Sequence, residues 1–173
     1  MGLTPVVLIG GYLCSSRLEK ASQELEKLTK SGLKEAALII DSHGGDIQPV
    51  VEFEEKLLRL PLRFNVKIYE ATSAAAFLVL VLVNGRAWVE MDKSIALEFH
   101  RGSLRLDAAD ILPDGRIEEK LHSYMKRYND RLFELLLERG LGGPKPLAEL
   151  WGSGWLKVPA KECLRLGLVH ALF

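Results

Sequence analysis

The chain has 173 residues, enough for one ordinary domain and too few for two of comparable size, so residues 1–173 are predicted to form a single domain. Hydrophobic residues make up 48% and charged residues 27% of the chain, which argues against a disordered or collagen-like protein and predicts a globular one. The 23 basic and 23 acidic residues cancel, which argues against nucleic acid or an anionic membrane surface as a partner.

The two cysteines and the apolar segments bear on the cell compartment. Cys14 and Cys163 lie far apart and outside any metal-binding motif, which indicates a reducing, cytoplasmic compartment and no metal site. The N-terminus lacks the basic leader of a signal peptide. The most apolar run, residues 74–83, has about half of the roughly 20 residues needed to span a bilayer, so we expect a buried helix there and no membrane segment.

The first half of the chain predicts crossover units of a parallel sheet. Short apolar runs fit buried strands, and apolar residues spaced three or four apart fit amphipathic helices. The expected elements are a strand at 6–9, a helix from 15 or 16 to 32, a strand at 37–40, a turn at 41–45, a helix at 47–60 and a strand at 66–69. A strand, a helix and a strand within about 35 residues are typical of a right-handed crossover between parallel strands.

The second half continues with helices and shorter strands. The expected elements are the helix at 74–83, a turn at 84–85, strands at 87–90 and 94–99 that form a hairpin, a long amphipathic helix at about 115–139, a loop at 140–146, a helix at 159–166 and a final strand within 168–173. The predicted fold class is therefore α/β, with a mainly parallel sheet flanked by helices.

Three segments at the carboxyl ends of predicted strands carry candidate catalytic groups, at the edge where parallel sheets bind ligands. The glycines after the second strand, Gly44 among them, expose backbone amides that can bind an anion, or they form only a tight turn. Ser73 is either a helix N-cap or a nucleophile whose oxyanion is bound by the amide of Ala74. His100 is either a structural histidine or a general base. Together they supply the nucleophile, base and amides that acyl transfer requires.

Four segments in the same order resemble those of the Clp protease proteolytic subunit: IIDSHGGDI, EATSAAAFL, SIALEFHRG and AKECLRLGLVHALF. The resemblance implies a ClpP/crotonase-like fold with repeated β-β-α or βαβ units. It also implies a serine endopeptidase that needs no cofactor and hydrolyses peptides or unfolded polypeptides inside a homo-oligomeric chamber. Ser73 aligns with that family's nucleophile and His100 with its base, and the amides of Gly44 and Ala74 are expected to form the oxyanion hole.

The third member of the catalytic triad is less directly indicated. Trp151 stands where the family has an acid, and Glu149, two residues away, is the nearest carboxylate, so Glu149 is the expected partner of His100. A main-chain carbonyl or a water molecule is the alternative. A small slip of the alignment would place Ala75 at the nucleophile position, and the protein would then be inactive.

The long helix at 115–139 aligns with the family's handle, which interleaves with a subunit of a facing ring. This implies Tyr124, Tyr128, Phe133 and Leu137 as contacts between copies, whereas a solvated surface helix of a monomer is the alternative. An ATP-dependent unfoldase is a further implied partner, although the family's N-terminal segment that contacts it has no evident counterpart before residue 6. A catalytically inactive or acyl-CoA-binding subunit of the same fold, acting as a structural partner, is the alternative function.

Overall fold

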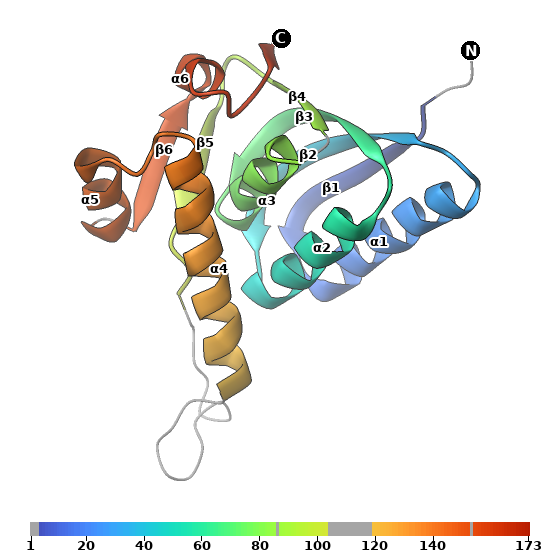
Figure 1. Cartoon of the computed structure of the whole chain (residues 1–173), viewed down its shortest axis with the longest axis horizontal. Coiled ribbons are helices and arrows are strands. Elements are labelled where there is room, and N and C mark those ends of the chain that lie inside the picture. The colour runs from blue at the N-terminus through green and yellow to red at the C-terminus, as the bar shows by residue number, and fades with distance from the viewer. Residues whose placement is uncertain (1–3, 86, 104–118, 153) are drawn as a thin grey trace.

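A computed structural model describes residues 4–85, 87–103, 119–152 and 154–173, and within these residues one seven-stranded sheet organises the chain (Figure 1). The strands are β1 (Val6–Leu13), β2 (Glu35–Gly45), β3 (Arg63–Thr72), β4 (Ala87–Met91), β5 (Ala96–His100), β6 (Trp155–Pro159) and β7 (Ala171–Leu172). The helices are α1 (Ser15–Lys30), α2 (Ile47–Arg59), α3 (Ala74–Val83), α4 (Glu119–Glu138), α5 (Pro144–Gly152) and α6 (Ala160–Arg165).

The sheet is mainly parallel, which confirms the predicted α/β class. The strands follow the order β1-β2-β3-β4-β7, and all of these neighbours are parallel. β5 also adds to β3 in parallel, beyond the end of β4, and its other neighbour β6 is antiparallel to it. The predicted hairpin of the strands at 87–90 and 94–99 is wrong, because both strands pair with successive parts of β3.

The core lies between one face of this sheet and the first three helices. Alternate side chains of the central strands are buried, and all ten residues of α3 are buried, as expected for the apolar run at 74–83. α3 contacts β2, β3, β4 and β5 as well as α2 and α4, so it is surrounded on every side. Within the described residues, no helix is both long and apolar enough to cross a membrane.

The element boundaries differ from the sequence prediction, and β1, β2 and β3 are each longer than the predicted strands. Residues 41–45 belong to β2 instead of forming a turn, because they continue to pair with β1, and Asp41 and Ser42 also pair with β3. α5 begins at Pro144, inside the predicted loop at 140–146. β6 was not predicted at all. Of the helix expected at 115–139, residues 119–138 form α4 and residues 115–118 lie outside the described ranges.

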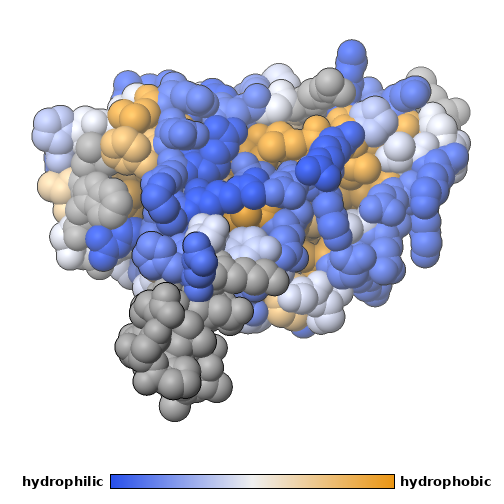
Figure 2. Space-filling view, turned by 60° about the horizontal axis from the view of Figure 1, so that its bottom comes forward, coloured by the Kyte–Doolittle hydropathy of each residue, from blue (hydrophilic) through white to orange (hydrophobic). Residues whose placement is uncertain are grey.

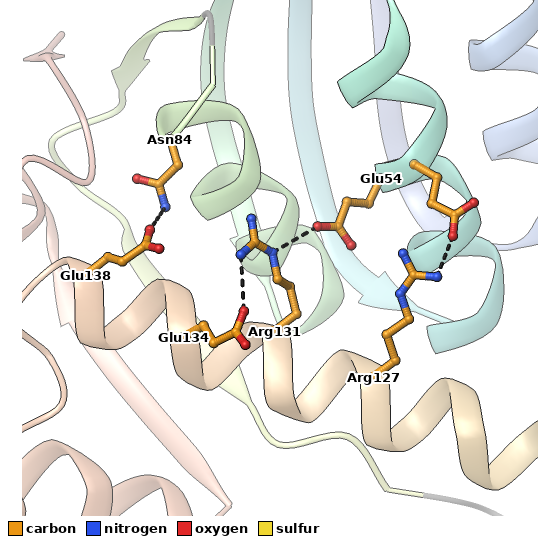
Figure 3. Close-up of polar contacts among 7 residues, drawn as sticks. Glu54, Asn84, Arg127, Arg131, Glu134 and Glu138 are labelled. Atoms are coloured by element: carbon orange, nitrogen blue, oxygen red, sulfur yellow. Dashed lines mark hydrogen bonds and ion pairs between the residues drawn. The ribbon is translucent and has the colours of Figure 1, made fainter.

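Salt bridges and hydrogen bonds attach α4 to α2 and to the end of α3 (Figure 3). Arg131 Nε donates to Glu54 Oε1 at 3.3 Å, and Arg127 pairs with Glu55. Near the other end of α4, Asn84 donates to Glu138 at 3.1 Å. Glu54 is only 3% exposed, and its desolvation raises the pKa of its carboxyl group while the Arg131 guanidinium opposes that rise. The remaining surface on this side of the molecule is largely hydrophilic (Figure 2).

One predicted contact residue of α4 is instead part of the core. Tyr128 is 1% exposed and its ring packs against Phe77, with the ring centroids 4.8 Å apart. It cannot contact another copy without leaving this core, so that assignment is wrong. Tyr124 and Phe133 are half-buried, and Leu137 is 47% exposed.

Candidate active site

Ser73 occupies a sharp turn from β3 into α3 and has a strained backbone. With φ 57° and ψ −121°, it is the one non-glycine residue with positive φ in the described part of the chain. Such a conformation costs about 1–3 kcal/mol and persists only where the surroundings enforce it. Here the Ser73 amide donates to the carbonyl of Glu98 at 2.6 Å, and the amide of Phe77 donates to the Ser73 carbonyl at 3.1 Å. Among the described residues, the Ser73 hydroxyl makes no capping hydrogen bond to α3.

Gly44 lies directly against this turn. A Cβ placed on Gly44 would lie 2.8 Å from the carbonyl oxygen of Thr72, 2.9 Å from Ser73 Cβ and 3.1 Å from the amide nitrogen of Ala74. Gly44 also has φ 97°, which side chains other than hydrogen rarely allow. The structure therefore brings together the glycine, the serine and the first amide of α3, where backbone N–H groups have no acceptor within the helix.

The amide of Gly44 already has a hydrogen-bond partner. It donates to Ser42 Oγ at 3.0 Å, and the Ser42 hydroxyl in turn donates to the carbonyl of Gly11 at 2.6 Å. Ser42 is fully buried. Sequence reasoning assigned no role to Ser42, although a hydroxyl two residues before an amide is a known pattern of local hydrogen bonding.

His100 ends β5, at the same carboxyl-end edge of the sheet as Ser73. The Ser73 amide is bonded to Glu98, and His100 lies two residues farther along β5, roughly 7 Å at the rise of a strand. The imidazole ring packs against the indole of Trp155 on β6, with the centroids 4.4 Å apart. Within the described residues no hydrogen bond joins His100 to the Ser73 hydroxyl. In enzymes without bound substrate, catalytic hydrogen bonds are often long or absent.

The environment of His100 favours its neutral form. Partial burial is the larger cause and the positive charge of Arg101 the smaller, and both lower the pKa of the imidazole. Neither cause is a carboxylate. Glu149 is exposed on α5, a helix that packs beside β6, and its expected role as the partner of His100 stays a prediction.

α4 supports the backbone that follows His100. The Tyr128 hydroxyl donates to the carbonyl of His100 at 3.3 Å, and Asn129 Oδ1 accepts the amide of Gly102 at 2.7 Å. A Cβ on Gly102 would lie 2.6 Å from Ile47 Cδ1, so the chain passes closely between α2 and α4. No sequence pattern indicated a role for Asn129, because a single asparagine in an amphipathic helix is usually solvated.

Comparison with known proteins identifies the fold. No family model and no curated protein matches the sequence. Among solved structures, an Asn-to-Asp mutant of ClpP1 from Listeria monocytogenes aligns with a TM-score of 0.72 over 97% of this chain and 90% of that one. The chain has a ClpP-like fold. The two sequences are only 16% identical, so the likeness shows the ClpP-like fold alone, and it confirms the resemblance found from the order of the four segments.

Metal ions were not expected at this site. Within the described ranges, no group of three or more His, Cys, Asp or Glu residues is arranged to hold one. The candidate groups described above at this edge are a hydroxyl, an imidazole and backbone amides.

Proposed function

We propose that this ClpP-like chain is a serine endopeptidase in which Ser73 is the nucleophile and His100 is its general base. The observation that carries the proposal is the strained backbone of Ser73, which resembles the strand-to-helix turn that presents the nucleophile in other serine hydrolases. A serine that only begins a helix needs no positive φ, because N-cap residues ordinarily adopt extended backbone conformations. The strain also favours Ser73 over Ala75 as the nucleophile position.

In the proposed reaction, His100 accepts the hydroxyl proton of Ser73 while Ser73 Oγ attacks the carbonyl carbon of a peptide bond. The oxyanion accepts hydrogen bonds from the amides of Ala74 and Gly44, each worth roughly 2.7–4 kcal/mol in related enzymes. Collapse of this intermediate breaks the C–N bond, and His100 gives its proton to the leaving amine. Water, deprotonated by His100, then hydrolyses the acyl-enzyme and restores Ser73.

A fluorophosphonate probe tests the assignment, because it reacts only with activated serines. We expect labelling of the wild-type protein and no labelling of Ser73→Ala or His100→Ala. Ser94→Ala is the matched control, since it removes an exposed hydroxyl that is bonded to Asp92 in the turn between β4 and β5. Equal labelling of Ser73→Ala and the wild type would contradict the proposal.

We also propose that the chain forms a closed homo-oligomer that encloses the site and admits peptides and unfolded polypeptides. The sheet face opposite α1–α3 supports this, because a mainly parallel sheet is rarely left uncovered on one face. The exposed apolar side chains on that face and its edge are Val6, Leu8, Tyr69, Trp88 and Phe173. A second copy is the occupant that fits a symmetric assembly.

Sedimentation at micromolar concentration tests the assembly. A species several times heavier than 19.3 kDa that cleaves peptides but spares folded proteins is the expected result. A fully active 19.3 kDa monomer would contradict it. The proposal includes no ATP-dependent unfoldase.

Two observations favour a second candidate, a catalytically inactive or acyl-CoA-binding subunit of the same fold. The amide of Gly44 is bonded to Ser42, and no hydrogen bond links Ser73 to His100 among the described residues. Such a protein would not react with the fluorophosphonate. Calorimetric titration with acetyl-CoA would then separate acyl-CoA binding from a purely structural role.

A further inference from the structure

The pairing of β1 with β2 is irregular immediately before Gly44. The register runs from Gly10 opposite Asp41 to Tyr12 opposite Gly44, so β1 has one residue where β2 has two. The single residue on β1 is Gly11, with φ 64°. An extra residue of this kind is a β-bulge, which leaves backbone groups without their usual ladder partners.

The hydroxyl of Ser42 bonds to backbone groups of both strands at this irregularity. It donates to the carbonyl of Gly11 at 2.6 Å and accepts the amide of Gly44 at 3.0 Å, so it satisfies one group on each strand. Rotation of the Ser42 side chain about its Cα–Cβ bond moves Oγ to another rotamer, whereas a ladder partner moves only if the strand moves. The Gly44 amide is therefore held by a partner that can release it.

We propose that Ser42 is a positioning residue that controls the oxyanion hole by holding the amide of Gly44 in the absence of substrate. This inference rests on the proposed peptidase function, in which the same amide stabilises the oxyanion. The amide cannot donate a full hydrogen bond to Ser42 Oγ and to the oxyanion at once. The hydrogen bond from the Gly44 amide to Ser42 must therefore break when the oxyanion forms. The free energy of breaking it reduces the stabilisation that the amide gives to the transition state.

Removing the hydroxyl should raise the reaction rate. In Ser42→Ala the amide of Gly44 loses this acceptor, so the oxyanion no longer competes with the Ser42 hydroxyl for it. The acceleration should be about 5- to 150-fold, which corresponds to the roughly 1–3 kcal/mol cost of an unpaired buried donor. The KM for a peptide should stay unchanged, because the exchange happens only when the oxyanion forms.

The experiment compares fluorophosphonate labelling rates, and kcat and KM for a peptide, in the wild type, Ser42→Ala and Ser22→Ala. Ser22 is the matched control, since it is 3% exposed and its hydroxyl donates to the carbonyl of Leu18 at 2.9 Å within α1. Both variants lose a buried serine hydroxyl, so both should be somewhat less stable. Only Ser42→Ala should react faster.

The possible outcomes separate this inference from the proposed function. A labelled wild type with an unchanged or slower Ser42→Ala overturns the role of Ser42 and leaves the peptidase proposal standing. An unlabelled wild type with a labelled Ser42→Ala supports Ser42 as an inhibitory contact, and absence of labelling in both overturns both proposals. Should Ser42→Ala not fold, Ser42→Cys keeps the shape with a weaker hydrogen-bonding group, and a rate no higher than that of the wild type overturns the inference.

Discussion

Replacing Gly44 by alanine tests the close approach of β2 to the Ser73 turn. The new Cβ would lie 2.8 Å from the Thr72 carbonyl and 2.9 Å from Ser73 Cβ, closer than packed atoms allow. Because the Thr72 carbonyl and the neighbouring Ala74 amide belong to the backbone, β2 and the turn must separate. Overpacking of this kind costs about 1–3 kcal/mol. The φ of 97° adds roughly 1–2 kcal/mol for a residue with a side chain.

Gly32 provides a control that has only one of these two costs. Its φ is 81°, but a Cβ there would meet nothing within 4 Å. Gly32→Ala should therefore lose about 1–2 kcal/mol of unfolding free energy from backbone strain alone. Gly44→Ala should lose about 2–5 kcal/mol, the sum of strain and overpacking.

Denaturant unfolding of both variants, followed by fluorophosphonate labelling, measures the two effects. Gly32→Ala should label at the wild-type rate, since it is remote from the site. Gly44→Ala should label much more slowly under conditions where it is folded, because Ser73 and the Gly44 amide are pushed apart. Equal stability of the two variants, together with wild-type labelling of Gly44→Ala, would refute the close approach.

Two further predictions concern titration and the attachment of α4. Peptidase activity should rise with pH through a midpoint below 6.5, because burial and Arg101 lower the pKa of His100 and only neutral imidazole accepts a proton. Arg101→Gln should move the midpoint of the kcat/KM profile upward. A flat profile from pH 5 to 8 would exclude His100 as the base. Arg131→Gln leaves the buried Glu54 carboxylate without its partner, and its unfolding free energy, measured with denaturant at pH 7, should fall by about 1.5–3 kcal/mol. Arg127→Gln, at the more exposed pair with Glu55, should lose at most about 1 kcal/mol. Since the pKa of Glu54 is raised in the folded state, the folded protein binds this proton more tightly than the unfolded chain does. The loss of unfolding free energy in Arg131→Gln should therefore shrink as pH falls through the folded-state pKa of Glu54. A loss that grows on acidification would contradict this.

The periodic elements could be predicted from the sequence because their cause is local. The apolar spacing in α1 and α2, the stop before Pro61 and the uniform apolarity of α3 place all three helices within a few residues of their observed bounds. These patterns reflect which side chains are buried, and burial follows the helix period.

The elements that were missed depend on pairing with distant residues. β2 continues through a diglycine because β1 pairs with it as far as Leu13, which no local pattern reveals. β6 forms because β5 offers an antiparallel edge, and β5 joins β3 instead of β4 because β4 ends at Met91.

At the candidate site, the sequence predicted which backbone positions meet but not how their polar groups are paired. Strand order brings Gly44 to Ser73, and the motif order was sufficient to indicate it. The hydrogen bonds of Ser42 and Asn129 depend on a bulge and on the docking of α4, which only the folded chain reveals.

β2, which carries Gly44, and β5, which carries His100, are attached to β3 to different extents. β2 pairs with β3 at eight positions, whereas β5 pairs with it only at Ala71–Leu97 and Thr72–Glu98. A local fluctuation that opens those two pairs would carry β5, with His100, away while β3 stays in the sheet. Amide hydrogens of β5 should then exchange with solvent sooner than those of β2, and mild heating should inactivate the protein before the parallel sheet melts.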